Sequence, residues 1–113
     1  MIDVPRARFE ELVADALDSL PEELGRRMEN VWVVVEERSA DGLLGLYEGI
    51  PLTERDNYGG MALPDRITIY RRAICAESHS EQDVVDNVRD TVIHEVAHHF
   101  GIDDDQLDAL GWS

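Results

Sequence analysis

The residues with the clearest potential for chemistry are two histidines four positions apart, His94 and His98, with Glu95 directly after the first. On a helix, side chains four residues apart leave the same face, about 6 Å from each other along the axis, so both imidazoles can bind one metal ion. Glu95 points about 100° round the helix from His94. It therefore flanks the ion without binding it, which suits a general base for a metal-bound water.

A third ligand is predicted just beyond the end of this helix. Gly101 follows His98 by three residues and allows the backbone to turn sharply. The turn can bring Asp104 back to the ion, whereas Asp103 and Asp105 are neighbours that could reach it instead or cap a last short helix. Two histidines, one carboxylate and one open position form the ligand set of a catalytic zinc rather than a structural one.

The composition sets limits on the protein and its partners. The chain has 113 residues, enough for one domain spanning residues 1–113 with a modest core, and a formal net charge of −15. Such a charge argues against a nucleic-acid partner, because binding to a phosphate backbone requires clustered Lys and Arg. Cys75 is the only cysteine, so no intrachain disulfide is expected. The first eight residues contain no apolar leader segment, and no run approaches membrane-spanning length, so we expect a cytoplasmic protein without a membrane partner.

The first half of the chain predicts a helix and then a strand. After Pro5, apolar residues recur at the spacing of one helical stripe: Phe9, Leu12, Val13, Ala16, Leu17 and Leu20. Pro21 ends this helix or starts a short turn over residues 22–28. Residues 31–35 are continuously apolar and mostly β-branched, which is typical of a central strand buried on both faces.

The middle of the chain predicts two further strands separated by a loop. Residues 43–52 are interrupted by glycines and a proline, and we expect one short strand followed by a loop. Residues 53–63 are irregular, either a loop over a functional site or a plain connector. Residues 66–71 alternate apolar and polar side chains, as a half-exposed strand does, and Pro64 is compatible with a position at the sheet edge.

The histidines lie in the last long helix. Ser80 with Asp83 three residues later forms a helix N-cap pattern, and an apolar stripe then continues to Phe100. Gly101 is expected to stop the helix. A last short helix, capped by Asp103 or Asp104, is expected to continue through residue 110.

Three segments resemble a known family. The run from His94 to Asp104, with the pattern HExxHxxGxxD, resembles the zincin metallopeptidases, and Asp104 in the third-ligand position resembles their aspartate-type members. Residues 45–52, 64–70 and 91–101 are similar to the small bacterial zincin-like metallopeptidases. The resemblance implies an α+β minimal zincin-like fold, with a small mixed sheet packed against an N-terminal helix and the HExxH helix. It also implies a hydrolase that cleaves peptide bonds with Zn²⁺ held by His94, His98 and Asp104, but it does not imply a particular substrate.

Two other functions remain open from the sequence. A small bacterial endoribonuclease family uses a related helix, but it has Gly where this chain has Glu95 and His where this chain has Asp105. A zinc-stabilised binding domain without activity is the third possibility, although a purely structural site has no use for a base. For a peptidase, the strand of residues 66–71 could pair with an extended peptide. His99 is expected to be packed or to support a ligand, and His79 to be exposed; Tyr47, Tyr58 and Tyr70 are assigned no role.

Overall fold

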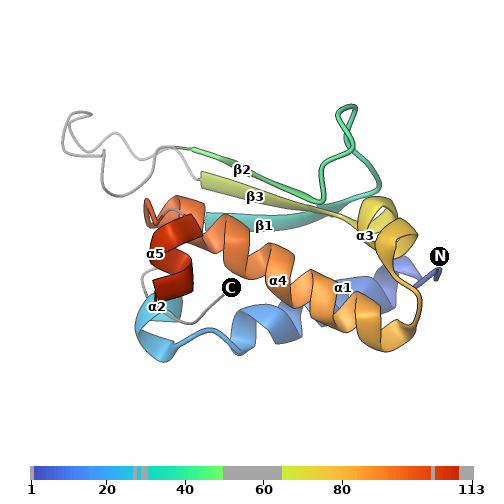
Figure 1. Cartoon of the computed structure of the whole chain (residues 1–113), viewed down its shortest axis with the longest axis horizontal. Helices are drawn as coiled ribbons and strands as arrows, with labels where there is room; N and C mark the ends of the chain where they lie inside the picture. Colours follow the sequence, from blue (N-terminus) through green and yellow to red (C-terminus); the bar gives the residue numbers. More distant parts are fainter. Residues whose placement is uncertain (1, 27, 29–30, 50–64, 103, 110–113) are drawn as a thin grey trace.

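The structure is a computed structural model that describes all residues except 1, 27, 29–30, 50–64, 103 and 110–113. Its elements follow in the order α1 (Arg6–Asp18), α2 (Glu22–Arg26), β1 (Val31–Glu36), β2 (Gly45–Glu48), β3 (Asp65–Tyr70), α3 (Arg71–Glu77), α4 (Glu81–His99) and α5 (Asp104–Ala109). The strands form a mixed sheet, and α1 and α4 lie together on one side of it (Figure 1). This arrangement confirms the predicted α+β fold with a small mixed sheet against the N-terminal helix and the HExxH helix.

Helix α1 has the apolar stripe that its sequence predicts. Its buried residues are Phe9, Leu12, Val13 and Ala16, and Leu17 and Leu20 are partly buried against the same core. The stripe packs against α4, so the two helices cover the sheet as one layer. Within the described ranges, no helix is both long enough and apolar enough to cross a membrane.

The order of the strands differs from the prediction. The order is β1–β3–β2, with β3 parallel to β1 and antiparallel to β2. The apolar run of residues 31–35 was expected at the centre of the sheet, but it forms β1, which pairs only with β3 among the described strands. One side of β1 faces the helices through Val33 and Val35, whereas Trp32 on the other side is 63% exposed. A β-branched run is equally compatible with both positions, because β propensity reflects packing that only the neighbouring elements supply.

Strand β3 was expected to be half exposed and at the edge, and that prediction was also wrong. It is the central strand, and all its residues except Arg66 are buried. Its polar residues can be buried because neighbouring elements supply hydrogen-bond partners or shield them from solvent. The alternation of apolar and polar residues in the sequence cannot reveal these neighbours. Arg71, predicted as the last residue of this strand, begins α3, a helix that the sequence did not indicate. Pro64 and the predicted loop of residues 53–63 lie outside the described residues, as does the loop expected after β2.

Helix α4 begins and ends where the sequence predicts. The Ser80 hydroxyl accepts a hydrogen bond from the backbone N–H of Asp83 at 3.1 Å, and the Asp83 carboxylate accepts one from the N–H of His79 at 2.9 Å. The first bond satisfies one of the backbone donors that a helix start leaves free, and the second fixes the residue before the N-cap. At the other end, Gly101 has a φ of 72°, a left-handed conformation that glycine adopts at low cost. The valines of the stripe, Val84, Val88, Val92 and Val96, are all buried.

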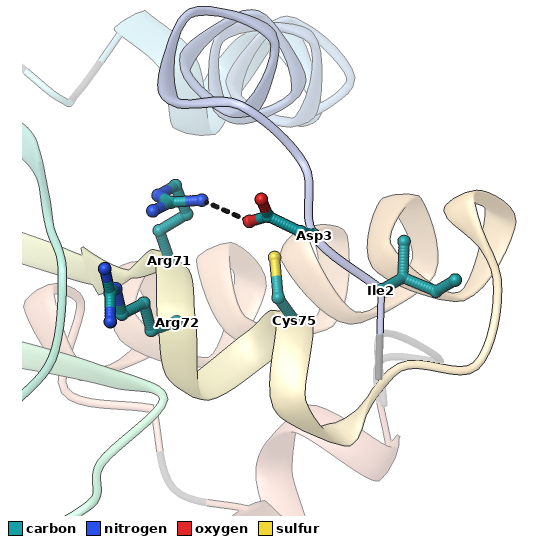
Figure 2. A pocket seen from close by; sticks show the side chains of 5 residues that line it. All are labelled: Ile2, Asp3, Arg71, Arg72 and Cys75. Atoms are coloured by element: carbon teal, nitrogen blue, oxygen red, sulfur yellow. Dashed lines mark hydrogen bonds and ion pairs between the residues drawn. The ribbon is translucent and has the colours of Figure 1, made fainter.

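The N-terminal segment lies against α3. The N–H of Ile2 donates to the carbonyl of Cys75 at 3.2 Å. A cavity of about 390 Å³ lies between them, lined by Ile2, Asp3, Arg71, Arg72 and Cys75 (Figure 2). The thiol of Cys75, the one cysteine in the sequence, is free and buried. Since α3 and α5 lie at opposite ends of α4, this cavity is remote from the predicted metal site (Figure 1).

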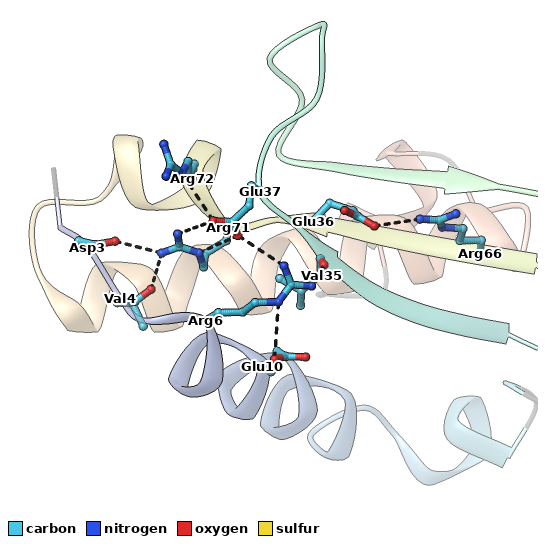
Figure 3. A network of polar contacts seen from close by, with 10 residues as sticks. All are labelled: Asp3, Val4, Arg6, Glu10, Val35, Glu36, Glu37, Arg66, Arg71 and Arg72. Carbon is cyan, nitrogen blue, oxygen red and sulfur yellow. Dashed lines mark hydrogen bonds and ion pairs between the residues drawn. The ribbon is translucent and has the colours of Figure 1, made fainter.

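Arg71 connects three parts of the chain. Its guanidinium donates to both carboxylate oxygens of Glu37 after β1, to the carbonyl of Val4 at 2.7 Å and to Asp3 at 3.0 Å (Figure 3). Arg71 is buried, with 9% of its surface exposed, so these partners replace the water that the charge loses. The hydrogen bonds from Arg71 lower the pKa of Glu37 from 4.5 to about 2.

This shift predicts an acid dependence of stability. Because the folded-state pKa of Glu37 lies below its unfolded value, its stabilising contribution is present above pH 4.5 and is lost as the pH falls towards about 2. We therefore expect the stability difference between the parent and Glu37→Gln, measured by urea denaturation, to be constant near neutrality and to shrink below pH 4.5. Glu36→Gln is the matched control, since the one ion pair of the Glu36 side chain among the described residues is an exposed contact with Arg66 at 3.2 Å. An equal difference at pH 7 and at pH 2.5 would contradict the role given to the Arg71 pair.

Candidate functional site

His94 and His98 lie side by side on the exposed face of α4. Their ring centroids are 5.7 Å apart, and the rings are inclined at 75° to each other. Both side chains are exposed, unlike those of Val92 and Val96 on the buried side of the same helix. The helix thus brings the two imidazoles together as their spacing predicts, and their assignment as metal ligands stays a prediction.

Glu95 is more buried than the sequence suggested. A residue that flanks the ion and receives a proton from water was expected, but Glu95 is only 7% exposed, and its Oε1 lies 3.2 Å from Nδ1 of His98. The donor and acceptor roles in this contact depend on the His98 tautomer; with the hydrogen on Nδ1, the ring donates to the carboxylate and Nε2 is left to bind an ion. Histidine ligands of metals are held in this way, with a carboxylate on the nitrogen that does not bind the ion. The contact therefore suits His98 to a metal, and Glu95 plays a supporting part that the sequence did not reveal.

Strand β2 lies directly against this part of α4 because residue 45 is a glycine. A Cβ at Gly45 would lie 2.7 Å from Cγ2 of Thr91, 3.1 Å from Cγ of Glu95 and 3.3 Å from its Oε2. Real Cβ atoms do not approach other atoms as closely as the first of these distances. The glycine therefore allows the strand to cover Glu95, which accounts for the burial of that carboxylate.

A cleft opens between β2 and α4 at the same place. Its volume is about 300 Å³, and it is lined by Leu44, Gly45, Asp90, Thr91, His94 and Glu95. The Glu95 side chain forms part of the wall, and His94 lies at its exposed side. One predicted metal ligand and the predicted base thus share a hollow with the start of a strand.

The third ligand can be placed only by its backbone. After the left-handed Gly101, the chain turns and Asp104 begins α5. The side chain of Asp104 is not among those that the structure describes, and neither is Asp103; the side chain of Asp105 is exposed. No cluster of three metal-binding side chains is found within the described part of the chain, which does not include the Asp104 carboxylate. The assignment of Asp104 over its two neighbours therefore stays a prediction.

A buried polar network supports the end of α4. His99 is 2% exposed, and its Nδ1 lies 2.7 Å from Oδ2 of Asp65 on β3. The Tyr47 hydroxyl on β2 donates to the same oxygen at 2.7 Å, and the His99 ring packs edge-on against Tyr47 and Phe100. The network therefore ties the histidine-bearing helix to two strands. A packed or supporting His99 was expected, but its partners Tyr47 and Asp65 were missed, because nothing local in the sequence connects them to it.

The other residues considered from the sequence have simple positions. His79 is exposed before α4, as expected. Tyr70 is buried in β3, and Tyr58 lies outside the described residues.

Comparisons with known proteins agree with this geometry. The model of a family described as zincin-like metallopeptidase matches residues 27–112. Among solved structures, the chain is similar to a conserved hypothetical protein from Thermus thermophilus, with 25% sequence identity and a TM-score of 0.57, over 95% of this chain and 97% of that one. No curated protein matches the chain significantly. Since the family model spans most of the sequence, including the HExxH helix and the strands, the chain belongs to the zincin-like metallopeptidase family.

Proposed function

We propose that the protein is a zinc-dependent metallopeptidase that hydrolyses peptide bonds. The observation that carries this proposal is that Glu95 and two adjacent exposed histidines on α4 lie beside a cleft that opens along β2. Membership of the zincin-like family supports the same function. A structural site would not require a carboxylate in the cleft wall beside the ligands.

The residues present suit zinc. His94, His98 and Asp104 would hold the ion, because imidazole and carboxylate ligands are typical of catalytic zinc sites. Bound zinc would activate a water molecule and polarise the carbonyl of the scissile bond. Glu95 would be the general base; its Oε1 lies 3.2 Å from Nδ1 of His98, and its Oε2 is turned towards Gly45, which lines the cleft. It would accept a proton from the attacking water and pass it to the leaving amine.

The substrate is best accommodated along β2. A peptide added to β3, as first expected, is ruled out because β3 is already paired with β1 and β2. Among the described strands, the second edge of β2 has no partner, and Gly45 at its start lines the cleft. An extended peptide can hydrogen-bond to such an edge through its main chain, largely independently of its sequence. The substrate would therefore be an extended peptide or an exposed protein segment.

The first prediction from this proposal concerns metal content. Protein purified without a chelator should contain about one zinc per chain, and His94→Ala or His98→Ala should lose it. His79→Ala is the control, since this histidine is exposed outside the site. Asp104→Ala should weaken zinc binding more than Asp103→Ala or Asp105→Ala. If elemental analysis finds as much zinc in the variant with both His94→Ala and His98→Ala as in the parent, the zinc site lies elsewhere.

The function itself is tested by peptide hydrolysis. The zinc-loaded protein is incubated with a broad peptide library, and cleavage is followed by mass spectrometry before chelation, after chelation and after zinc is restored. Cleavage that disappears with the chelator and returns with zinc is expected. A fully loaded protein that cleaves no peptide would favour a zinc-stabilised binding domain, and cleavage of RNA in its place would favour the endoribonuclease.

A further inference from the structure

The cleft contains one charged side chain that the proposed mechanism does not use. Asp90 lies one turn before His94 on α4, and both side chains are exposed and line the same hollow. We propose that Asp90 selects peptides with a basic residue beside the scissile bond. This inference rests on the proposed peptidase function and adds a substrate class to it.

The side chains that line the cleft include two acidic ones. Asp90 and Glu95 are both acidic, and no Lys or Arg lines the cleft among the described residues. Asp90 makes no hydrogen bond or ion pair with any other residue that the structure describes, so its oxygens are available to a ligand. Asp86, one turn earlier, accepts a hydrogen bond from Nε2 of Gln82 at 3.1 Å and does not line the cleft. Of Asp86 and Asp90, it is therefore Asp90 whose carboxylate a substrate in the cleft would contact.

The spacing indicates which substrate residue reaches Asp90. Four residues of helix separate it from His94 by about 6 Å, and an extended peptide rises about 3.3 Å per residue. Asp90 therefore lies about two peptide residues from His94, the nearer of the two predicted histidine ligands. A Lys or Arg one or two positions from the scissile bond can place its charge beside this carboxylate, with its aliphatic part against Leu44.

For a peptide that pairs antiparallel to β2, the direction of this strand gives the side of the scissile bond on which the basic residue lies. Gly45 is next to Thr91 and Glu95, whereas Tyr47 packs on His99, so β2 and α4 run in the same direction. A peptide antiparallel to β2 runs the opposite way and passes the metal ligands before it reaches Asp90. The residues that follow the scissile bond would then lie beside Asp90, and the preferred cation is the first or second of them.

The test compares matched peptides that carry lysine or the neutral isostere norleucine at these two positions. The zinc-loaded parent should cleave the lysine peptide with a higher kcat/KM, by roughly fivefold to tenfold, the effect of one partly exposed ion pair with good geometry. Asp90→Asn should remove this preference, so that the lysine and norleucine peptides are cleaved with similar kcat/KM. Asp86→Asn is the matched control, because it removes the same charge one turn outside the cleft, and it should keep the preference. A lysine preference that persists in Asp90→Asn, or is absent from the parent, would overturn the proposal.

A binding measurement separates this proposal from the proposed function. The same two peptides are titrated into zinc-loaded Glu95→Gln, with and without Asp90→Asn, so that the readout does not require hydrolysis. If the parent cleaves nothing but the lysine peptide still binds more tightly through Asp90, the peptidase function fails and the role of Asp90 stands. If peptides are cleaved and neither measurement depends on Asp90, the function stands and this inference fails. Absence of both cleavage and preferential binding overturns both.

Discussion

Replacement of Glu95 by glutamine is expected to lower peptide hydrolysis by roughly 10²–10⁴-fold, the usual contribution of a positioned acid–base group. Glutamine has nearly the same shape but cannot accept the proton of the attacking water. Zinc should remain bound, because Glu95 follows the first ligand on the helix and is not a ligand itself. Turnover and metal content measured on the same zinc-loaded sample test both expectations.

The buried position of Glu95 makes a stability measurement necessary. Its Oε1 contacts Nδ1 of His98 at 3.2 Å, and the amide oxygen of glutamine can accept the same hydrogen bond. We therefore expect only a small change in melting temperature for Glu95→Gln. Glu81→Gln, the same change at the exposed start of α4, is the control and should affect neither turnover nor melting. A lower melting temperature with turnover preserved would assign Glu95 a purely structural role.

The second large effect is expected at Asp65, which lies far from the cleft residues in sequence. Its Oδ2 accepts hydrogen bonds from both His99 and Tyr47, and Asp65 and His99 are each 2% exposed. Asp65→Ala would remove the acceptor that the buried His99 ring and the partly buried Tyr47 hydroxyl share, and a buried donor that loses its acceptor costs about 1–3 kcal/mol. We expect the free energy of unfolding to fall by about 2–5 kcal/mol, a large part of the stability of a domain of this size. Urea denaturation of the zinc-free proteins measures this change without a contribution from metal binding.

Two variants separate the hydrogen bonds from the packing. Tyr47→Phe removes one donor and keeps the ring, so it should cost about 1 kcal/mol. Asp65→Asn keeps the size and shape of the side chain. Size matters here because the backbone at Gly49 lies very close to Asp65: a Cβ at residue 49 would be 2.5 Å from Cγ of Asp65. Its cost should lie between those of Tyr47→Phe and Asp65→Ala. If Asp65→Ala is as stable as the parent, the network does not anchor α4.

The most local features of the chain could be predicted from its sequence. Helix α4, its Ser80 cap, its end at Gly101 and the common face of His94 and His98 all follow from residues within a few positions of one another. The stripe of α1 and the short strand β2 were predicted for the same reason. The HExxHxxGxxD pattern also indicated the family, because the predicted ligands all lie on one helix and the turn that follows it, within a short stretch of sequence.

The tertiary structure decided which segments meet. Strand order depends on pairings between residues about thirty positions apart, such as Val33 with Ile67. The composition of a strand does not indicate whether it lies at the centre or the edge of the sheet. The burial of Glu95 follows from the contact of Gly45 on β2, and the support of His99 from Asp65 on β3. The position of Asp90 beside a cleft depends on the same contact between β2 and α4. Short-range patterns in the sequence thus determined the helices and the candidate ligands. The surroundings of these ligands depend on packing between segments that are distant in the sequence, and rules based on local propensity or spacing cannot predict such packing.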